Sequence, residues 1–131
     1  SQPKNWILCH IDSVQDNFLI QGEGEDEKIS LIDWEYAGMQ DEDVDIAMFA
    51  IYAMYEKDKV DELIDAYYTE GCTGEVRLKI YAYIAVCGFL WSNWCEFKRH
   101  EGVEFGEYSL RQYGYAKEYY RYVKQGLEGE Q

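Results

Sequence analysis

Two short apolar runs, separated by a polar stretch, open the chain. Residues 6–9 (WILC) and 18–21 (FLIQ) have the length and composition of β-strands, and the polar sequence HIDSVQDN lies between them. The glycines and charges of residues 22–27 predict a turn, and the apolar residues within 29–34 predict a returning strand. The pattern therefore predicts a strand, a polar loop and a β-hairpin over residues 18–34.

Beyond the hairpin, apolar residues recur at helical spacing. Residues 46–55 are ten consecutive apolar residues, and they follow Asp43, a residue type that caps helix N-termini. A membrane-spanning helix needs ~20 apolar residues, so this segment predicts a buried helix and no membrane contact. Residues 60–68 have the spacing of an amphipathic helix that ends at Gly71.

The remainder of the chain predicts two more helices. Apolar residues in steps of three and four between Val76 and Trp94 are typical of a long helix with one apolar face. The tyrosine-rich segment 106–124 predicts a final helix that Gly114 interrupts, because glycine lowers helix propensity. Strands followed by helices indicate an α+β fold, with a short β-hairpin region and then a mostly helical bundle.

The composition indicates one globular domain. A chain of 131 residues can bury one core, and 47% hydrophobic residues argue against disorder. The four cysteines show no C-x-x-C spacing, and no apolar leader precedes residue 6. We therefore expect neither a metal nor a disulfide framework, and a location in the reducing cytoplasm.

The net charge of −14, from 26 acidic and 12 basic residues, argues against one class of partner. Such a chain repels a phosphate backbone at long range, so we expect no nucleic-acid binding. A well-solvated surface is the simpler explanation of the acidity. A cationic substrate is also compatible with it.

The polar loop carries a pattern with a chemical meaning. His10, Asp12 and Asn17 fit H-x-D-x-x-x-x-N, and Asp33 lies on the predicted returning strand. In kinase-like phosphotransferases the Asp of such a loop accepts the hydrogen of the attacking hydroxyl, and an Asn and a later Asp hold Mg²⁺ through oxygen atoms. The motif alone also arises by chance, because loops favour polar residues. The flanking strands and the hairpin favour the functional interpretation, in which we expect His10 to brace the loop through hydrogen bonds.

The stretches HIDSVQDNFLI and LIDWEYAGMQDEDVDIA are similar to the choline/ethanolamine kinase family, above all to its bacterial choline kinases. The resemblance covers residues 1–131, but only as the C-terminal lobe of such a kinase. It implies that Asp12 is the catalytic base, that Asn17 and Asp33 bind Mg²⁺, and that choline and ATP are the substrates.

Three aspartates alternate with other residues just before the run of apolar residues 46–55. Asp41, Asp43 and Asp45 alternate as at the start of a calcium loop, which requires Gly at its sixth position and Glu at its twelfth. This chain has Ile46 and Tyr52 there, so we reject calcium. In the family resemblance, an Asp placed like Asp45 supports the catalytic loop.

Trp91 and Trp94 stand three residues apart and share one face of the predicted helix. Aromatic residues at this spacing usually belong to a core. Choline kinases, however, resemble this chain in a W-x-x-W on a late helix whose rings enclose a quaternary ammonium, and Tyr36 matches another aromatic residue of that cage. Near Tyr52 this chain has an apolar or tyrosyl position where animal enzymes carry an acidic residue.

The resemblance also indicates which part of such a kinase residues 1–131 lack. Kinases of this superfamily have an N-terminal lobe with a phosphate-covering loop and a lysine, and nothing before residue 6 supplies them. We therefore expect the isolated 131 residues to be inactive. The surface that met the missing lobe is expected to be partly apolar and to favour self-association.

Three functions remain open from the sequence. The first is an ATP-dependent choline kinase that produces phosphocholine, and the second is phosphotransfer to another acceptor, such as ethanolamine or an aminoglycoside. An aminoglycoside would need a wide acidic cleft, whereas the permanent charge of choline favours an aromatic box. The third is a non-catalytic, pseudokinase-like module that binds choline, against which the intact Asp12, Asn17 and Asp33 argue.

Overall fold

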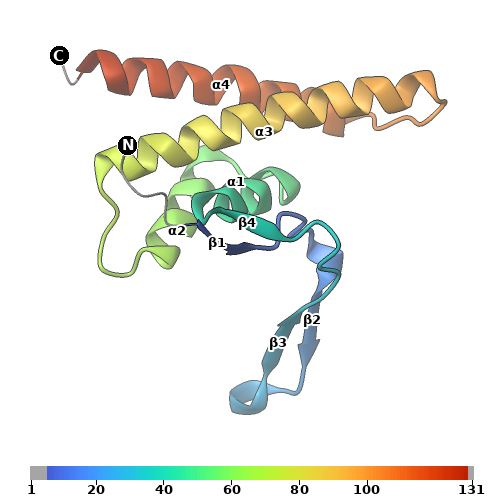
Figure 1. Cartoon of the computed structure of the whole chain (residues 1–131), viewed down its shortest axis with the longest axis vertical. Helices are drawn as coiled ribbons and strands as arrows, with labels where there is room; N and C mark the ends of the chain where they lie inside the picture. The colour runs from blue at the N-terminus through green and yellow to red at the C-terminus, as the bar shows by residue number, and fades with distance from the viewer. Residues whose placement is uncertain (1–5, 130–131) are drawn as a thin grey trace.

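The computed structural model describes residues 6–129 and shows strands at the beginning of the chain and helices after them (Figure 1). This confirms the predicted α+β class. Two short 3₁₀ turns, Gln15–Asn17 and Gly24–Asp26, accompany the strands. The elements in chain order are β1 Trp6–Cys9, β2 Phe18–Gln21, β3 Lys28–Leu31, β4 Gly38–Asp41, α1 Asp43–Tyr52, α2 Lys57–Tyr67, α3 Gly74–His100 and α4 Glu107–Gly129.

The strands form two separate antiparallel pairs. β1 pairs with β4, with Trp6 opposite Asp41, and β2 pairs with β3 as a hairpin that projects away from the helices (Figure 1). β4 was not predicted, because the sequence GMQD contains a glycine and two polar residues and no alternation. Pairing with β1 selects the strand there, which is a tertiary effect that local preference does not encode.

The predicted hairpin is confirmed, but its returning strand is shorter than predicted. β3 ends at Leu31, and the backbone N–H of Ile32 donates to the carbonyl oxygen of Asn17 at 2.9 Å, which closes the hairpin at its base. Asp33 then adopts a left-handed backbone with a φ of 63°, so the chain leaves the strand direction at this residue. The predicted turn at residues 22–27 is confirmed.

The helices meet in one core around α1. The predicted buried helix is confirmed, although it ends at Tyr52, three residues before the end of the apolar run. Its most buried apolar residues are Ala47, Ala50 and Ile51, each 0% exposed. The N-cap is Glu42 and not Asp43, which is the first helical residue. Val44, Ile46 and Met48 of α1 belong to the same core, and the other three helices add buried residues that include Val60, Ile64, Ile80, Ile84, Tyr115 and Tyr119.

Helices α3 and α4 run side by side over most of their length (Figure 1). The side chain of Thr73 caps α3 by accepting a hydrogen bond from the N–H of Val76 at 3.3 Å. The expected interruption of α4 at Gly114 is wrong, because the helix continues unbroken to Gly129. The neighbouring Tyr115 is buried against the core, and this packing outweighs the low helix propensity of a single glycine.

Gly88 sets how closely α3 and α4 approach each other. A Cβ atom at Gly88 would lie 2.8 Å from the carbonyl oxygen of Gln112 and 2.8 Å from the Cβ of Tyr115. We therefore expect Gly88→Ala to lower the free energy of unfolding by about 1–3 kcal/mol, because the helices must separate. Gly114→Ala is the matched control, since nothing lies within 4 Å of its added Cβ, and we expect it to raise stability by ~0.5–1 kcal/mol. Urea unfolding of both variants measures the difference, and equal effects would contradict the account.

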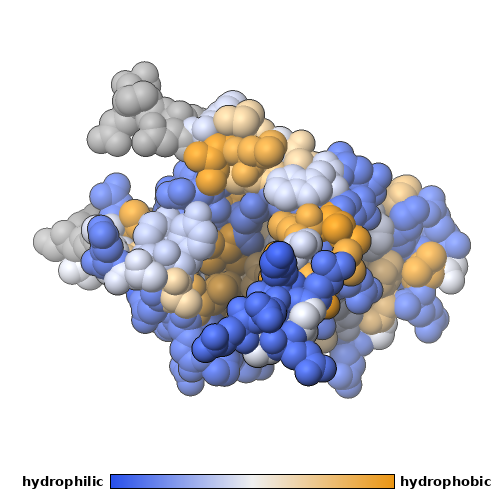
Figure 2. Space-filling view, turned by 90° about the horizontal axis from the view of Figure 1, so that it is seen from below, coloured by the Kyte–Doolittle hydropathy of each residue, from blue (hydrophilic) through white to orange (hydrophobic). Residues whose placement is uncertain are grey.

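Several large apolar side chains remain on the surface of the strands. Trp6 (53% exposed), Leu8 (58%) and Met39 (55%) belong to β1 and β4. Figure 2 shows apolar surface in the recess at the middle of its view, bordered by hydrophilic residues. Within residues 6–129, no helix has both the length and the apolar content needed to cross a membrane.

Candidate active site

The loop after β1 turns sharply at Ile11. This residue has a φ of 71°, which is strained for a β-branched side chain and needs support from its surroundings. The carboxylate of Asp45, in the first turn of α1, supplies that support. It accepts the backbone N–H of His10 at 2.8 Å and that of Ile11 at 2.7 Å. The structure thus joins Asp45 to the two residues directly before Asp12.

His10 fastens the same loop to the base of the hairpin. The residue is 2% exposed, and its Nε2 lies 2.8 Å from the carbonyl oxygen of Ile32. Because that oxygen can only accept, Nε2 carries the hydrogen and donates. The ring also meets Trp34 edge to face, with 4.7 Å between the ring centres. Loop and hairpin therefore form one connected unit.

Asp12 and Asn17 lie next to each other within the loop. The side-chain nitrogen of Asn17 donates to the backbone carbonyl of Asp12 at 2.8 Å and approaches the Asp12 carboxylate at 3.4 Å. Asn17 is buried, whereas Asp12 is partly exposed. Since the nitrogen of the Asn17 amide is occupied, its oxygen is the atom that remains for a cation.

Asp33 follows the residue that pairs with Asn17 across the base of the hairpin. Its side chain is exposed, and within residues 6–129 no basic side chain forms a salt bridge with it. The amide oxygen of Asn17 and the carboxylate of Asp33 are both hard oxygen donors, so their chemistry fits Mg²⁺. A magnesium ion that takes only one or two protein ligands uses water and phosphate oxygens for the rest.

The three aspartates that resemble a calcium loop have other partners. Asp41 and Asp43 both pair with Lys79, at 3.0 and 2.6 Å, and Asp45 binds backbone N–H groups. All three carboxylates are therefore engaged in structural contacts. In the part of the chain that the structure describes, no three His, Cys, Asp or Glu residues form a group that could hold a metal.

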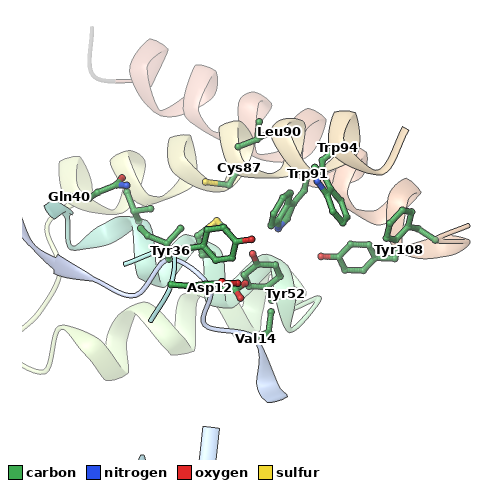
Figure 3. Close-up of a pocket in the computed structure, with 15 residues that line it drawn as sticks. Asp12, Val14, Tyr36, Gln40, Tyr52, Cys87, Leu90, Trp91, Trp94 and Tyr108 are labelled. Carbon is green, nitrogen blue, oxygen red and sulfur yellow. The ribbon is translucent and has the colours of Figure 1, made fainter. Parts of the chain in front are cut away.

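A pocket of about 940 Å³ opens beside Asp12, between the loop, α1 and the facing part of α3 and α4. Six of the residues that line it are aromatic and two are acidic, and none is basic. Figure 3 shows the hydroxyl groups of Tyr36, Tyr52 and Tyr108 directed into the space between them, with Trp91 and Trp94 above. The aromatic and acidic residues that line the pocket are Asp12, Glu35, Tyr36, Tyr52, Trp91, Trp94, Phe105 and Tyr108.

The aromatic rings form a continuous wall. The ring centres of Trp91 and Trp94 are 5.3 Å apart, and Trp91 lies 5.7 Å from Tyr52. Trp94 continues the wall to Phe105 at 5.3 Å. Trp94 is 41% exposed and Tyr36 is 62% exposed, so both rings have a face available to a ligand. The structure thus brings the three predicted cage residues to one pocket, together with Asp12.

The pocket keeps Tyr52 and Tyr108 neutral. Burial raises the pKa of Tyr52, and the neighbouring carboxylate of Asp12 raises it further. Burial also raises the pKa of Tyr108, to about 12. Both hydroxyl groups therefore carry their hydrogen at neutral pH, and the negative charge of the pocket comes from Asp12 and Glu35.

Of the eight aromatic and acidic residues that line the pocket, four were not predicted from the sequence to be site residues. Tyr52 was counted as part of an apolar run, and Glu35 was given no role. Phe105 comes just before α4 and Tyr108 lies in its first turn, and they reach the pocket because α4 folds back along α3. The sequence offers one signal for Phe105 and Tyr108: the two aromatic residues stand three positions apart beside a glycine-containing turn.

A loop carboxylate beside an asparagine, with a second carboxylate beyond a hairpin, is typical of kinase-like phosphotransferases. The chain belongs to the choline/ethanolamine kinase family, because the family model "Choline/ethanolamine kinase" matches residues 1–72. These residues include the loop, the hairpin, β4, α1 and α2. The family recognised from the sequence is therefore confirmed.

Curated relatives agree with this family. Two proteins named Protein LicA, both from Haemophilus influenzae, are 34% identical to this chain over 111 residues. The matched part is 79% of this chain, but only 39% of one relative and 31% of the other. The chain thus spans well under half the length of these relatives.

Solved structures show the same fold. A choline/ethanolamine kinase family protein from Mesorhizobium loti superimposes with a TM-score of 0.65 at 24% identity, covering 97% of this chain and 41% of that one. The choline kinase LicA from Streptococcus pneumoniae gives a TM-score of 0.61 at 27% identity, covering 95% of this chain and 40% of that one. The fold of residues 6–129 is therefore that of part of a choline kinase-like protein.

Proposed function

We propose that residues 1–131 are the C-terminal lobe of an ATP-dependent choline kinase, which transfers the γ-phosphoryl group of ATP to the hydroxyl of choline. The observation that carries this proposal is the composition of the pocket beside Asp12. Its walls offer six aromatic rings and two carboxylates, and none of the residues that line it is basic. A quaternary ammonium cannot donate hydrogen bonds, so ring faces and negative charge are what can bind it.

In this proposal Asp12 acts on the acceptor. Its carboxylate lies at the edge of the pocket, where it can accept the hydrogen of the choline hydroxyl as that oxygen attacks phosphorus. Asn17 and Asp33 would hold Mg²⁺, which neutralises charge on the phosphates when it is bound. Asp45 and His10 keep the loop in shape, so Asp12 needs little reorganisation during the reaction.

The lobe that completes the kinase is part of the proposal. A phosphate-covering loop and a lysine would come from an N-terminal lobe, and the apolar side chains exposed on β1 and β4 are available to pack against it. A solved relative is described as LicA in complex with AMP, with 26% identity and a TM-score of 0.61 over 95% of this chain, which supports nucleotide binding. The full-length protein is this chain joined to such a lobe, acting in the cytoplasm.

The acceptor can be tested by substrate preference. We expect the full-length protein to show a kcat/KM for choline at least about tenfold above that for ethanolamine, since a primary ammonium holds its water more strongly and gains less from aromatic faces. An aminoglycoside should not be phosphorylated, because only two carboxylates line the pocket. A higher kcat/KM for ethanolamine than for choline would show that ethanolamine is the preferred acceptor. The protein would still be a phosphotransferase.

The two tryptophans should control choline affinity. Each ring contributes about 0.5–2 kcal/mol of cation–π attraction when desolvated, and ~1.4 kcal/mol is a factor of ten in affinity. Trp91→Ala or Trp94→Ala should therefore raise the KM for choline several-fold to about thirtyfold. The KM for ATP should change little, and a Phe substitution should be milder because it keeps a ring. Steady-state kinetics with each substrate varied measure both constants.

A core role for the tryptophans predicts a different result. A buried Trp→Ala change costs about 3–5 kcal/mol of stability and would affect both substrates alike. Phe97→Ala is a suitable control, because this side chain lies on the same helix, is 59% exposed and does not line the pocket. A Trp94→Ala variant that melts early yet retains the wild-type KM for choline would exclude the cage.

A further inference from the structure

Helix α4 holds the C-terminal end of α1. Gln112 of α4 is completely buried (0% exposed), and its Nε2 donates a hydrogen bond to the carbonyl oxygen of Ile51 at 2.9 Å. Close to one turn further along α4, the hydroxyl of Tyr115 donates to the carbonyl oxygen of Tyr55 at 2.7 Å. The two bonds connect segments about 60 residues apart, and the residues that they hold lie on either side of Tyr52.

The segment held by these two hydrogen bonds contains the end of α1. The last carbonyl groups of a helix have no partner in a following helical turn. The carbonyl oxygen of Ile51 accepts the backbone N–H of Met54 at 3.3 Å and, at the shorter distance of 2.9 Å, the side chain of Gln112. The helix ends at Tyr52, and Met54 has a left-handed φ of 52°, so the chain changes direction there. Gln112 thus contacts the backbone of α1 at its terminal turn, directly before Tyr52.

Packing alone does not explain a glutamine at this position. The Oε1 of Gln112 is buried and has no hydrogen-bond partner among residues 6–129. A buried amide oxygen without a partner costs free energy that an apolar side chain of similar size would not cost. The bond from its Nε2 to Ile51 is therefore the feature that distinguishes Gln112 from a methionine or leucine.

Tyr52 links this bond to the pocket. Its ring lies 5.7 Å from Trp91, and it lines the pocket together with Asp12 (Figure 3). The carbonyl of Ile51 belongs to the peptide unit that precedes Tyr52, so a shift at this carbonyl moves the tyrosine directly. Gln112 itself does not line the pocket.

We propose that Gln112 is a positioning residue of the acceptor pocket, which fixes Tyr52 against Trp91 and Asp12 by holding the end of α1. The kinetic consequence rests on the proposed choline kinase function. The structural consequence, a displaced Tyr52 when the Nε2 donor is absent, does not depend on that function.

Gln112→Met tests the inference, because methionine keeps the length of the side chain and removes the donor. In the full-length protein we expect the KM for choline to rise about fivefold, the equivalent of one net hydrogen bond. The KM for ATP should stay within about twofold, because Tyr52 lies on the acceptor side of Asp12. Gln125→Met is the matched control, an exposed glutamine on the same helix that should leave both constants unchanged.

A spectroscopic measurement separates this inference from the proposed function. In full-length protein with ¹³C-labelled tyrosine, the ring resonances of Tyr52 should shift in Gln112→Met and not in Gln125→Met. If the wild type does not phosphorylate choline, the proposed function fails, while this measurement still decides the role of Gln112. Unshifted Tyr52 resonances, an unchanged KM for choline, or equal rises in both KM values would overturn the inference.

If Gln112→Met does not fold, a second variant tests the same inference. Tyr115→Phe removes the other bond to this segment and keeps the ring in the core, so it should disturb the fold less. We expect a smaller rise in the KM for choline, of about two- to fivefold, with the KM for ATP unchanged. An unchanged KM for choline in this variant would count against the holding role of α4.

Discussion

Replacing Asp12 with asparagine should lower the kcat of the full-length protein by about 10²–10⁴-fold, the usual contribution of a positioned proton acceptor. The change is nearly isosteric. The backbone carbonyl of Asp12, which accepts the 2.8 Å bond from Asn17, is unaffected by it. The loop should therefore keep its shape, with nucleotide binding and the KM for choline within a few-fold of the wild type.

Asp16→Asn is the matched control for this loss. Asp16 belongs to the same loop and is exposed, and it does not line the pocket. Steady-state kinetics should therefore show wild-type turnover for this variant, which excludes a general effect of one lost carboxylate. Near-normal turnover of Asp12→Asn would show that the loop does not have the role proposed for it.

Replacing Asp33 with alanine should abolish magnesium-dependent nucleotide binding. Loss of a residue that only supports a metal ligand already costs about 10–100-fold in metal affinity, so loss of a ligand should weaken the binding of Mg²⁺–ATP by more than ~100-fold. Isothermal titration calorimetry of the full-length protein measures this directly. Asn17→Ala should weaken binding less, with partial recovery at higher Mg²⁺, because a neutral amide contributes less attraction than a carboxylate.

A second substitution of Asp33 is needed because its backbone is left-handed. Alanine at a φ of 63° is strained, so part of any loss in Asp33→Ala could come from the backbone. Asp33→Gly removes the carboxylate without this strain, and we expect it to lose binding to the same extent. Asp26→Ala, at the exposed tip of the hairpin, should bind Mg²⁺–ATP normally. Normal binding by Asp33→Gly would exclude Asp33 as a metal ligand.

Local features of the sequence predicted the elements whose partners are close in the chain. The hairpin over residues 18–34 follows from two apolar runs around a glycine-containing turn, and the loop motif places Asp12 and Asn17 only five residues apart. The 3.6-residue period predicted α3 over its central part, and the ten apolar residues predicted a buried helix at α1. Each of these signals is contained in a single short segment.

Features that depend on distant segments were not predicted. β4 becomes a strand only because β1 pairs with it, and Gly114 remains helical only because its neighbours pack against α1 and α3. Tyr52 and Tyr108 reach one pocket because α4 lies along α3, a geometry set partly by the close approach at Gly88. Which residues form the pocket walls therefore depends on the tertiary packing of distant segments. The loop motif beside the walls is contained in one short segment and can be read from the sequence.

The most direct test of the account is the product itself. Full-length protein is incubated with ATP, Mg²⁺ and choline, and the reaction is followed by ³¹P NMR. The account predicts a new phosphomonoester resonance that coincides with added phosphocholine and grows in step with ADP, and that Asp12→Asn suppresses by about 10²–10⁴-fold. ATP that stays intact, or that yields inorganic phosphate in place of phosphocholine, would contradict it.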